Sequence, residues 1–334
     1  MMEQGGGATV EIRVPTYRRP VLLERALRSA LAQTDADWRC IVFDDCAQHS
    51  ARPLVESLGD ARFVYRANAV QRGAIGNIDQ CFRNSPYAGG GFALVLEDDN
   101  YLLPEHIAAQ RTLAQRKNVG VVFAGQFCEK VLTAGQPGER TSEKTLVWIY
   151  REQTYEAATA AAALLFSHAF SNGAAFWRLG GPSDFEIGAA VTDDPGMQET
   201  LRILRLAEPV FVSHEATAVW RWNDPSDSYV SAKADKPSRW RRALEARRRL
   251  DARAIYLRGA GAAGMMKALA HFDARFAVEA ERAALMAGFD CRLTERDAGS
   301  RRKLRARGLA LRALVPRQIA PDAFPAWRAR RDPA

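Results

Sequence analysis

Three adjacent acids, Glu97, Asp98 and Asp99, directly follow an unbroken apolar run at residues 92–96 (FALVL). Such a run is typical of a buried parallel strand, and open α/β sheets bind ligands outside the carboxyl ends of their strands. Neighbouring carboxylates repel one another unless a cation or a hydroxyl-rich ligand uses them. Carboxylate oxygens on a loop suit Mg²⁺ or Mn²⁺ held together with substrate phosphates. The alternative is a solvated acidic turn before the next helix, whose N-terminus favours negative charge.

A second acidic pair, Asp44 and Asp45, follows another predicted strand at residues 39–43 (RCIVF). Alone, this pair would be interpreted as a turn and helix N-cap. Two acidic groups at the carboxyl ends of two strands of one sheet would instead converge on one crevice. The two pairs together therefore favour a ligand site.

The elements that must position these acids alternate between strand and helix. The apolar spacing predicts strands at 9–14, 39–43, 62–65, 92–96 and 119–123, and helices beginning at Pro20, at 76–84 and at 104–116. This alternation predicts a parallel sheet covered on both faces by helices.

After Gly125 the pattern is less regular. We predict a loop or hairpin at 126–144, strands at 146–150, 174–178 and 208–212, helices at 156–166 and 196–207, and a polar loop at 214–231. From residue 237 onward the chain is Arg-rich, and its apolar residues predict helices at 238–257, 276–287 and 301–317.

Charge is distributed unevenly along the 334 residues. Residues 237–334 hold 23 Lys and Arg against 10 Asp and Glu, a net charge of +13, whereas residues 1–236 carry a net charge of −5. The apolar content of 47% and charged content of 26% are close to globular averages and argue against wholesale disorder. The asymmetry indicates two functional parts, of which the basic one could face an anionic surface.

The cysteines and the N-terminus bear on the compartment. The five cysteines show no metal-ligand spacing and are expected to be reduced thiols. The first residues lack a basic segment followed by an apolar run, and no apolar stretch is long enough to span a membrane. We therefore expect a cytoplasmic protein, with peripheral contact at the inner membrane face as an open possibility.

Several segments in order carry a family resemblance. The opening VEIRVPTYRRPVLLERALRSALAQTDADWRCIVFDDC resembles that of family 2 glycosyltransferases, inverting enzymes of the GT-A fold. RGAIGN (residues 72–77) and LEDDNYLLP, in the place of the family's Asp-x-Asp motif, continue the resemblance. NGAAFWRL and TDDPGMQETLRI extend it less clearly, to about residue 231.

The resemblance implies an α/β GT-A architecture, a Rossmann-like and mostly parallel sheet flanked by helices. We expect a catalytic domain at 8–236, made of a nucleotide-binding half (8–125) and an acceptor half (126–236). A helical, basic C-terminal extension would follow at 237–334.

The resemblance also implies roles for individual residues around the nucleotide. Pro15, Tyr17 and Asp45 match positions that hold the base, and an Asp carboxylate could accept a hydrogen bond from a uracil imide. Arg72 matches an Arg that faces the nucleotide. From the residues alone, Tyr17 could equally be a core aromatic and Arg72 a surface residue.

Further positions would carry the chemistry. Asp98 would contact the ribose or sugar, and Asp99 would bind the Mn²⁺ or Mg²⁺ that bridges the diphosphate, with Glu97 in the place of the motif's first acid. Asp194 would be the general base that deprotonates the acceptor; the competing interpretation is a helix N-cap before Pro195. Arg221 would pair with phosphate oxygens, and Asn223 stands where the family often has His.

Together these residues predict an inverting glycosyltransferase. It would move a sugar from a nucleoside-diphosphate donor, most simply a UDP-sugar, to a hydroxyl on a glycan, a lipid-linked glycan or a small molecule. The alternatives are a nucleotidyltransferase of similar fold and a non-catalytic nucleotide-sugar binding protein. Residues 237–334 could contact an anionic membrane or simply cap the catalytic domain; nucleic acid is not expected, because aromatics are not interleaved with the Arg runs.

Overall fold

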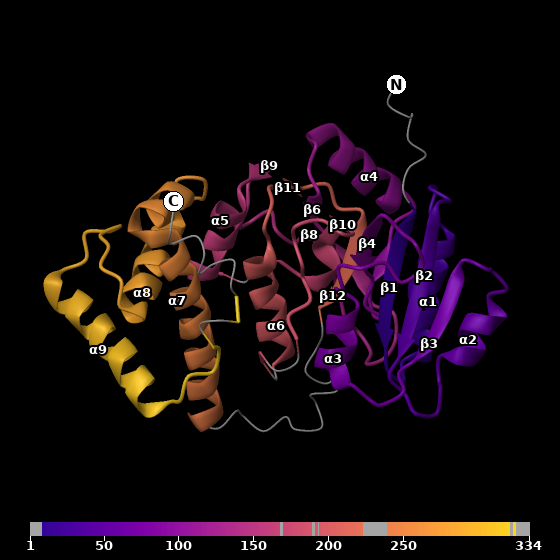
Figure 1. The fold of residues 1–334 in the computed structure, drawn as a ribbon, viewed down its shortest axis with the longest axis horizontal. Coiled ribbons are helices and arrows are strands. Elements are labelled where there is room, and N and C mark those ends of the chain that lie inside the picture. Colours follow the sequence, from indigo (N-terminus) through magenta and orange to yellow (C-terminus); the bar gives the residue numbers. More distant parts are fainter. Residues whose placement is uncertain are drawn as a thin grey trace.

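The computed structural model describes residues 9–167, 170–188, 191–192, 194–222, 239–320 and 323–324. Figure 1 shows a mixed α/β body with the C-terminal helices gathered on one side of it. The predicted α/β fold with a helical C-terminal region is confirmed.

The N-terminal half builds the parallel part of the main sheet. Its strands pair in the order β3-β2-β1-β4, all parallel, and β1 is buried along its whole length. Their bounds are β1 Val10–Thr16, β2 Trp38–Asp44, β3 Phe63–Ala67 and β4 Phe92–Val95. Because the strands are parallel, the acids that follow β2 and β4 lie at the same edge of the sheet, as the sequence predicted.

The sheet continues through β10, β6, β11 and β9, so that the described residues form an eight-stranded sheet. Strand β10 runs antiparallel to both β4 and β6, and β9 runs antiparallel to β11. The bounds are β6 Val121–Ala124, β9 Gln153–Tyr155, β10 Ala175–Arg178 and β11 Val210–Ser213. The sheet is therefore mostly parallel, with two reversed strands, β10 beside β4 and β9 at the edge beside β11.

A second sheet has the order β5-β12-β7-β8 in the described chain. Its strands are β5 Tyr101–Leu102, β7 Phe127–Lys130, β8 Glu139–Lys144 and β12 Ala218–Trp222. Strands β7 and β8 form the predicted hairpin. Strand β12 corrects the sequence prediction, because we expected residues 214–231 to be a loop; β12 instead pairs with both β5 and β7.

Helices cover both faces of the main sheet. One buried cluster joins the sheet to α1 (Pro20–Leu31), α2 (Arg52–Ser57) and α4 (His106–Lys117). The other cluster joins it to the elements α3 (Gly73–Gln80), α5 (Ala157–Ala160), α6 (Pro195–Leu201) and the 3₁₀ helices η1 (Ala161–Leu165), η2 (Asn172–Ala174) and η3 (Arg202–Arg205). Pro20 begins α1, as predicted. Proline is favoured there because the N–H that it lacks would have no intrahelical acceptor in the first turn.

The C-terminal helices share the second cluster. They are α7 (Arg239–Leu269), α8 (Ala277–Ala287) and α9 (Ala298–Leu314), with the short η5 (Ala274–Phe276) between α7 and α8. Buried α7 residues such as Tyr256 and Leu257 belong to the same cluster as Leu164 and Leu165 of η1. The predicted boundary between 236 and 237 lies outside the described residues and stays a prediction.

One predicted strand, at 146–150, is wrong. Leu146 has a φ of 66°, in the left-handed region, and the amides of Ile149 and Tyr150 both donate to its carbonyl. The segment is therefore a compact turn that buries Leu146, Ile149 and Tyr150. Apolar content alone did not distinguish a buried turn from a buried strand.

Candidate functional site

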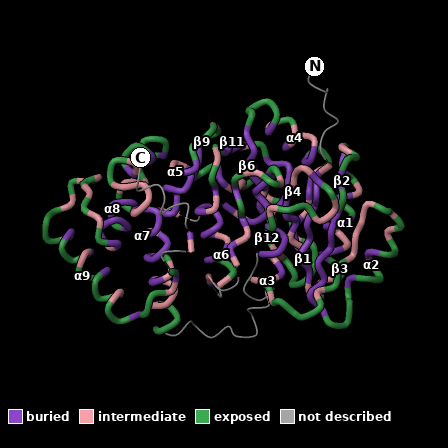
Figure 2. Tube along the Cα trace, viewed as in Figure 1, coloured by how far each residue is buried: buried purple, intermediate pink, exposed green. Residues whose placement is uncertain are grey.

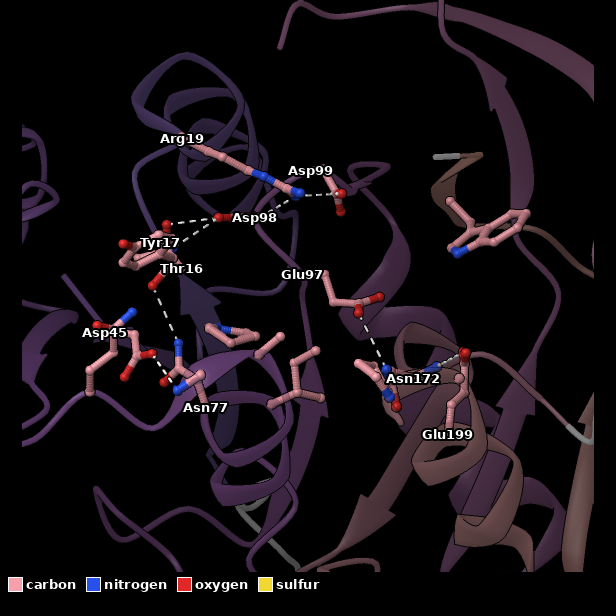
Figure 3. A pocket seen from close by; sticks show the side chains of 18 residues that line it. Thr16, Tyr17, Arg19, Asp45, Asn77, Glu97, Asp98, Asp99, Asn172 and Glu199 are labelled. Carbon is pink, nitrogen blue, oxygen red and sulfur yellow. Dashed lines mark hydrogen bonds and ion pairs between the residues drawn. The ribbon is translucent and has the colours of Figure 1, made fainter. Parts of the chain in front are cut away.

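A cavity of about 300 Å³ opens at the carboxyl ends of β1, β2 and β4. It is lined by residues from the turn after β1, the end of β2, α3, the acidic run after β4, η2, α6 and β12. These residues are Pro15, Thr16, Tyr17, Arg19, Asp45, Gln71, Gly73, Ala74, Asn77, Ile78, Glu97, Asp98, Asp99, Asn172, Pro195, Gly196, Glu199 and Trp220. The two acidic groups predicted to converge do share one crevice (Figure 3).

The turn after β1 holds the acids that follow β4. The Thr16 hydroxyl donates to Asp98 Oδ2 at 2.8 Å, and Arg19 Nη1 lies 3.2 Å from Asp98 Oδ1 and 2.8 Å from Asp99 Oδ2. Figure 3 shows the Arg19 side chain reaching across to both carboxylates. Burial raises the pKa of Asp98 to about 6, although the Arg19 charge opposes the shift. Arg19 is thus a site residue that the sequence analysis had not assigned.

A second group of carboxylates faces the cavity around Asn172. The Asn172 side-chain amide donates to Glu97 Oε1 at 3.2 Å, and its backbone amide donates to Glu199 Oε1 at 2.9 Å. Figure 3 shows Glu97 and Glu199 on either side of Asn172. Burial raises the pKa of Glu199 to about 7, and burial together with the Asp99 and Glu199 charges raises the pKa of Glu97 to about 8.

Glu199 is a further site residue, one that was not predicted from the sequence. It lies in TDDPGMQETLRI four residues after Pro195, so both residues are on the same side of α6, and both line the cavity. That spacing was available in the sequence. The sequence did not indicate that this side of α6 faces the cavity, because that orientation depends on how the helix packs.

Asp45 is buried at the cavity wall and organises the start of α3. Its Oδ1 accepts from the Arg72 backbone amide at 2.7 Å and from Asn68 Nδ2 at 2.8 Å, while its Oδ2 accepts from the Gly73 amide at 2.8 Å. Asp45 therefore satisfies two of the N–H groups that a helix N-terminus leaves without partners. Asp44, the other member of the pair, accepts from the amides of Cys46 and Ala51 instead and does not line the cavity.

Of the other residues predicted to bind the nucleotide, two line the cavity and one does not. Pro15 and Tyr17 line the cavity, and Tyr17 is half-buried with the Arg18 guanidinium 5.1 Å from its ring centre. The Arg72 side chain is exposed and is not among the lining residues, although Gln71 and Gly73 on either side of it are. Arg72 therefore contributes its backbone amide to this site, through Asp45.

Asp194 caps the start of α6 and is not among the residues that line the cavity. Its Oδ1 accepts from the Met197 amide at 2.9 Å, and its Oδ2 lies 3.2 Å from Arg248 Nη1 of α7. The neighbouring lining residues are Pro195, Gly196 and Glu199. The alternative interpretation of Asp194 as an N-cap describes this geometry, and the carboxylate that α6 presents to the cavity is Glu199.

Arg221 also lies elsewhere than predicted. Its side chain is fully buried and its Nη1 donates to Glu129 Oε1 at 3.0 Å and to the Gln136 carbonyl at 2.6 Å. This geometry holds β12 against β7 and does not extend into the cavity, whose nearby lining residue is Trp220. Asn223 lies outside the described residues.

Within the described ranges, no three His, Cys, Asp or Glu side chains are grouped so that they could share a metal ion. Asp99 nevertheless lines the cavity with Oδ2 paired to Arg19, while its Oδ1 accepts no hydrogen bond from a described residue. One carboxylate oxygen thus faces the cavity uncommitted. This donor set fits a divalent cation that takes its other ligands from substrate phosphates and water.

The N-terminal half of the chain is similar in sequence to known glycosyltransferases. Residues 11–171 match the sequence profile of glycosyl transferase family 2. A Campylobacter jejuni GalNAc(5)-diNAcBac-PP-undecaprenol beta-1,3-glucosyltransferase is 35% identical over 130 residues, which are 36% of this chain and 39% of the relative. An Escherichia coli UDP-Glc:alpha-D-GlcNAc-diphosphoundecaprenol beta-1,3-glucosyltransferase is 25% identical over 114 residues, 34% of this chain and 44% of the relative. The matched part therefore spans less than half the length of these relatives.

The overall fold is similar to that of Staphylococcus aureus TarS. The structure of TarS residues 1–349 in complex with UDP-GlcNAc superposes with a TM-score of 0.53 at 15% identity, covering 97% of this chain and 88% of that one. The complex with UDP gives a TM-score of 0.53 at 13% identity, covering 97% and 90%. At these identities the similarity establishes the fold alone.

Proposed function

We propose, from the match of residues 11–171 to the profile of glycosyl transferase family 2, that this chain belongs to that family and transfers a sugar from a UDP-linked donor to an acceptor hydroxyl with inversion. The observation that carries the proposal is the cavity itself, where carboxylates from two loops and from α6 meet at the carboxyl ends of the sheet. The UDP and UDP-GlcNAc complexes of TarS, a protein of the same fold, support a uridine nucleotide as donor.

The donor's nucleotide would lie over the turn after β1. Tyr17 offers a half-buried aromatic face, and Asp45 Oδ2 accepts one described hydrogen bond, which leaves it capacity for an imide N–H. Asp98 would accept from a ribose or sugar hydroxyl. Arg19, already beside Asp98 and Asp99, supplies positive charge that complements a diphosphate.

Asp99 would hold the Mn²⁺ or Mg²⁺ that the family resemblance implies. When bound, such an ion supplies Lewis acidity that stabilises charge on the departing nucleoside diphosphate. The remaining roles fall to side chains of this chain. Asp98 is buried and Glu97 is partly buried at the cavity wall, and Asn172 holds Glu97 in place.

The proton step requires a carboxylate next to the acceptor. The acceptor oxygen forms a bond to the anomeric carbon while the bond from that carbon to the phosphate oxygen breaks, and the hydroxyl proton passes to the base. The geometry favours Glu199 over Asp194, because Glu199 lines the cavity while Asp194 is committed to the Met197 amide and Arg248. Burial raises the pKa of Glu199 to about 7, and a base whose pKa lies near the working pH is the most effective.

For the acceptor, we propose a hydroxyl of a lipid-linked glycan. The support comes from the two bacterial relatives, whose names describe transfer to undecaprenol-linked sugars. We place the reaction on the cytoplasmic side of the membrane, where UDP-sugars would be available to it.

The test is a thermal-shift screen of UDP, GDP and their sugar conjugates, each with Mn²⁺ and with EDTA. A ligand that binds the native state raises the apparent stability by an amount set by its concentration and affinity. We expect a UDP-sugar with Mn²⁺ to give the largest increase, followed by slow hydrolysis of that donor. A screen in which no nucleotide sugar raises the melting temperature would overturn the proposal, and binding without hydrolysis or transfer would indicate a non-catalytic module.

A further inference from the structure

Helix α9 has two unlike sides, and its inner side is explained by packing against α8. At Gly308 the two helices approach so closely that an added Cβ would lie 1.9 Å from the Met286 carbonyl oxygen. Buried Arg301 pairs with Glu281 of α8 and, at 2.7 Å, with Asp290. Arg301 is therefore a structural residue that holds α9 to α8.

The outer side of α9 combines cations with exposed leucines. Arg302, Lys303 and Arg307 are exposed, and none forms an ion pair with any residue that the structure describes. Leu309 is 60% exposed and Leu314 is 75% exposed on the same helix. The sequence contains no Asp or Glu between Ala298 and Pro321, so no acid on this helix offsets the charge.

The beginning of α7 adds a second exposed apolar group among cations. Trp240 is 54% exposed between Arg239 and Arg241, which are also exposed. Arg247 of α7 donates to the Val315 carbonyl at 2.9 Å, which fixes the end of α9 to α7. The two helices therefore present their outer residues as parts of one rigid region, and Figure 2 shows much of α9 exposed.

We propose that the outer side of α9 (Arg302, Lys303, Arg307, Leu309 and Leu314) docks on an anionic lipid surface. Cations of an interfacial helix pair with lipid phosphates while apolar side chains enter the boundary with the acyl chains. Exposed leucines give such a helix an affinity for lipid that charge alone would not supply. A nucleic acid or other dissolved polyanion would use the three cations and leave both leucines in water.

The docking can be tested independently of the proposed activity. In Figure 1 α9 lies along the lower left margin and the first turns of α7 lie at the lower edge. Among the described residues, every helix is too short or too polar to serve as a membrane-spanning segment. Contact through α9 would be peripheral and reversible.

The experiment uses the full chain and co-sedimentation with vesicles, without donor or metal. One set of vesicles contains equal parts phosphatidylglycerol and phosphatidylcholine, and the other contains phosphatidylcholine alone. The variants are R302Q/K303Q/R307Q, L309Q/L314Q, and a matched control R39Q/R116Q/K130Q, which removes three exposed cations from the main body. Each cation near an anionic surface contributes about 1 kcal/mol, so the α9 triple variant should bind about a hundredfold more weakly.

We expect binding to the anionic vesicles alone, about a tenfold loss in the leucine variant, and little change in the control. Two results would overturn lipid docking in favour of polyanion binding. One is a leucine variant that binds the anionic vesicles as tightly as the unsubstituted protein. The other is soluble polyphosphate that displaces the protein from the vesicles as effectively as added anionic lipid does. If the control variant lost as much vesicle affinity as the α9 triple variant, the binding would depend on the net charge of the protein and not on α9. Circular dichroism confirms that each variant is folded, and donor hydrolysis should be unchanged in all of them, which separates this test from that of the proposed function.

Discussion

The main body and the C-terminal helices use charge in opposite ways. In the main body, arginines are buried against carboxylates, as in Arg13 with Glu11 and Arg202 with Asp79. On α9, Arg301 and Arg305 pair with described acids, whereas Arg302, Lys303 and Arg307 are exposed and form no ion pair with a residue that the structure describes. Buried charge without a partner is costly, so interior pairs hold elements together, whereas exposed cations remain available to a partner. The uneven charge in the sequence thus has two different structural meanings.

The largest predicted effect tests whether the buried carboxylates of the main body do chemistry. Glu199→Gln keeps the hydrogen bond from the Asn172 amide and removes the base, so kcat should fall about a thousandfold with donor binding retained. In the unsubstituted protein, kcat/KM should rise with pH up to about pH 7, because Glu199 must be deprotonated. The matched control is Asp194→Asn; if it abolishes transfer while Glu199→Gln does not, Asp194 is the base.

The next effect concerns Asp99, whose free oxygen faces the cavity. Asp99→Asn should lower kcat/KM about a hundredfold, because it removes the charge that would hold the cation and its diphosphate. Calorimetry should show metal-dependent donor binding in the unsubstituted protein, and EDTA should abolish the dependence. Donor binding by Asp99→Asn that is unchanged with Mn²⁺ would contradict the assignment. Asp37→Asn, which changes an acid of the same type away from the cavity, is the control.

A stability measurement tests the other side of the comparison, the packing of α9. Gly308→Ala places a methyl group against the Met286 backbone and should lower the free energy of unfolding by about 2 kcal/mol. Gly264→Ala is the control, since its Cβ would meet only a methyl carbon, of Ala260, at 3.6 Å, and Ala favours helix. Urea denaturation should separate the two, and equal midpoints would show that α9 is not tightly held.

The smallest effect is the pH dependence of stability at Glu97. Its pKa is raised to about 8 from 4.5, so the folded protein keeps a proton that the unfolded chain releases. Stability from this group is therefore present at low pH and is lost as pH rises toward 8. Glu97→Gln should therefore be more stable than the unsubstituted protein at pH 9 and not at pH 5. Glu24→Gln, at a half-exposed position outside the cavity, should show no such difference.

Much of the main body could be predicted from sequence, for a physical reason. Strands β2 and β4 are buried along most of their length, so each contains an apolar run, and the ends of these runs are marked by Asp44, Asp45 and Glu97–Asp99. Strand β1 instead alternates apolar residues with the buried pair of Glu11 and Arg13. The turn at Leu146 and strand β12 were mispredicted because burial there depends on neighbours distant in sequence. Local pattern carries no information about such contacts.

The same division holds for the site. The sequence by itself determined that acids follow two strands, that they meet at one edge of a parallel sheet, and that basic residues accumulate after 237. Only the tertiary structure decided which carboxylates face the cavity, because a side chain's direction depends on how its helix or strand packs. That packing directs Glu199 inward, commits Asp194 to Arg248, buries Arg221 against Glu129, and leaves one side of α9 both charged and apolar.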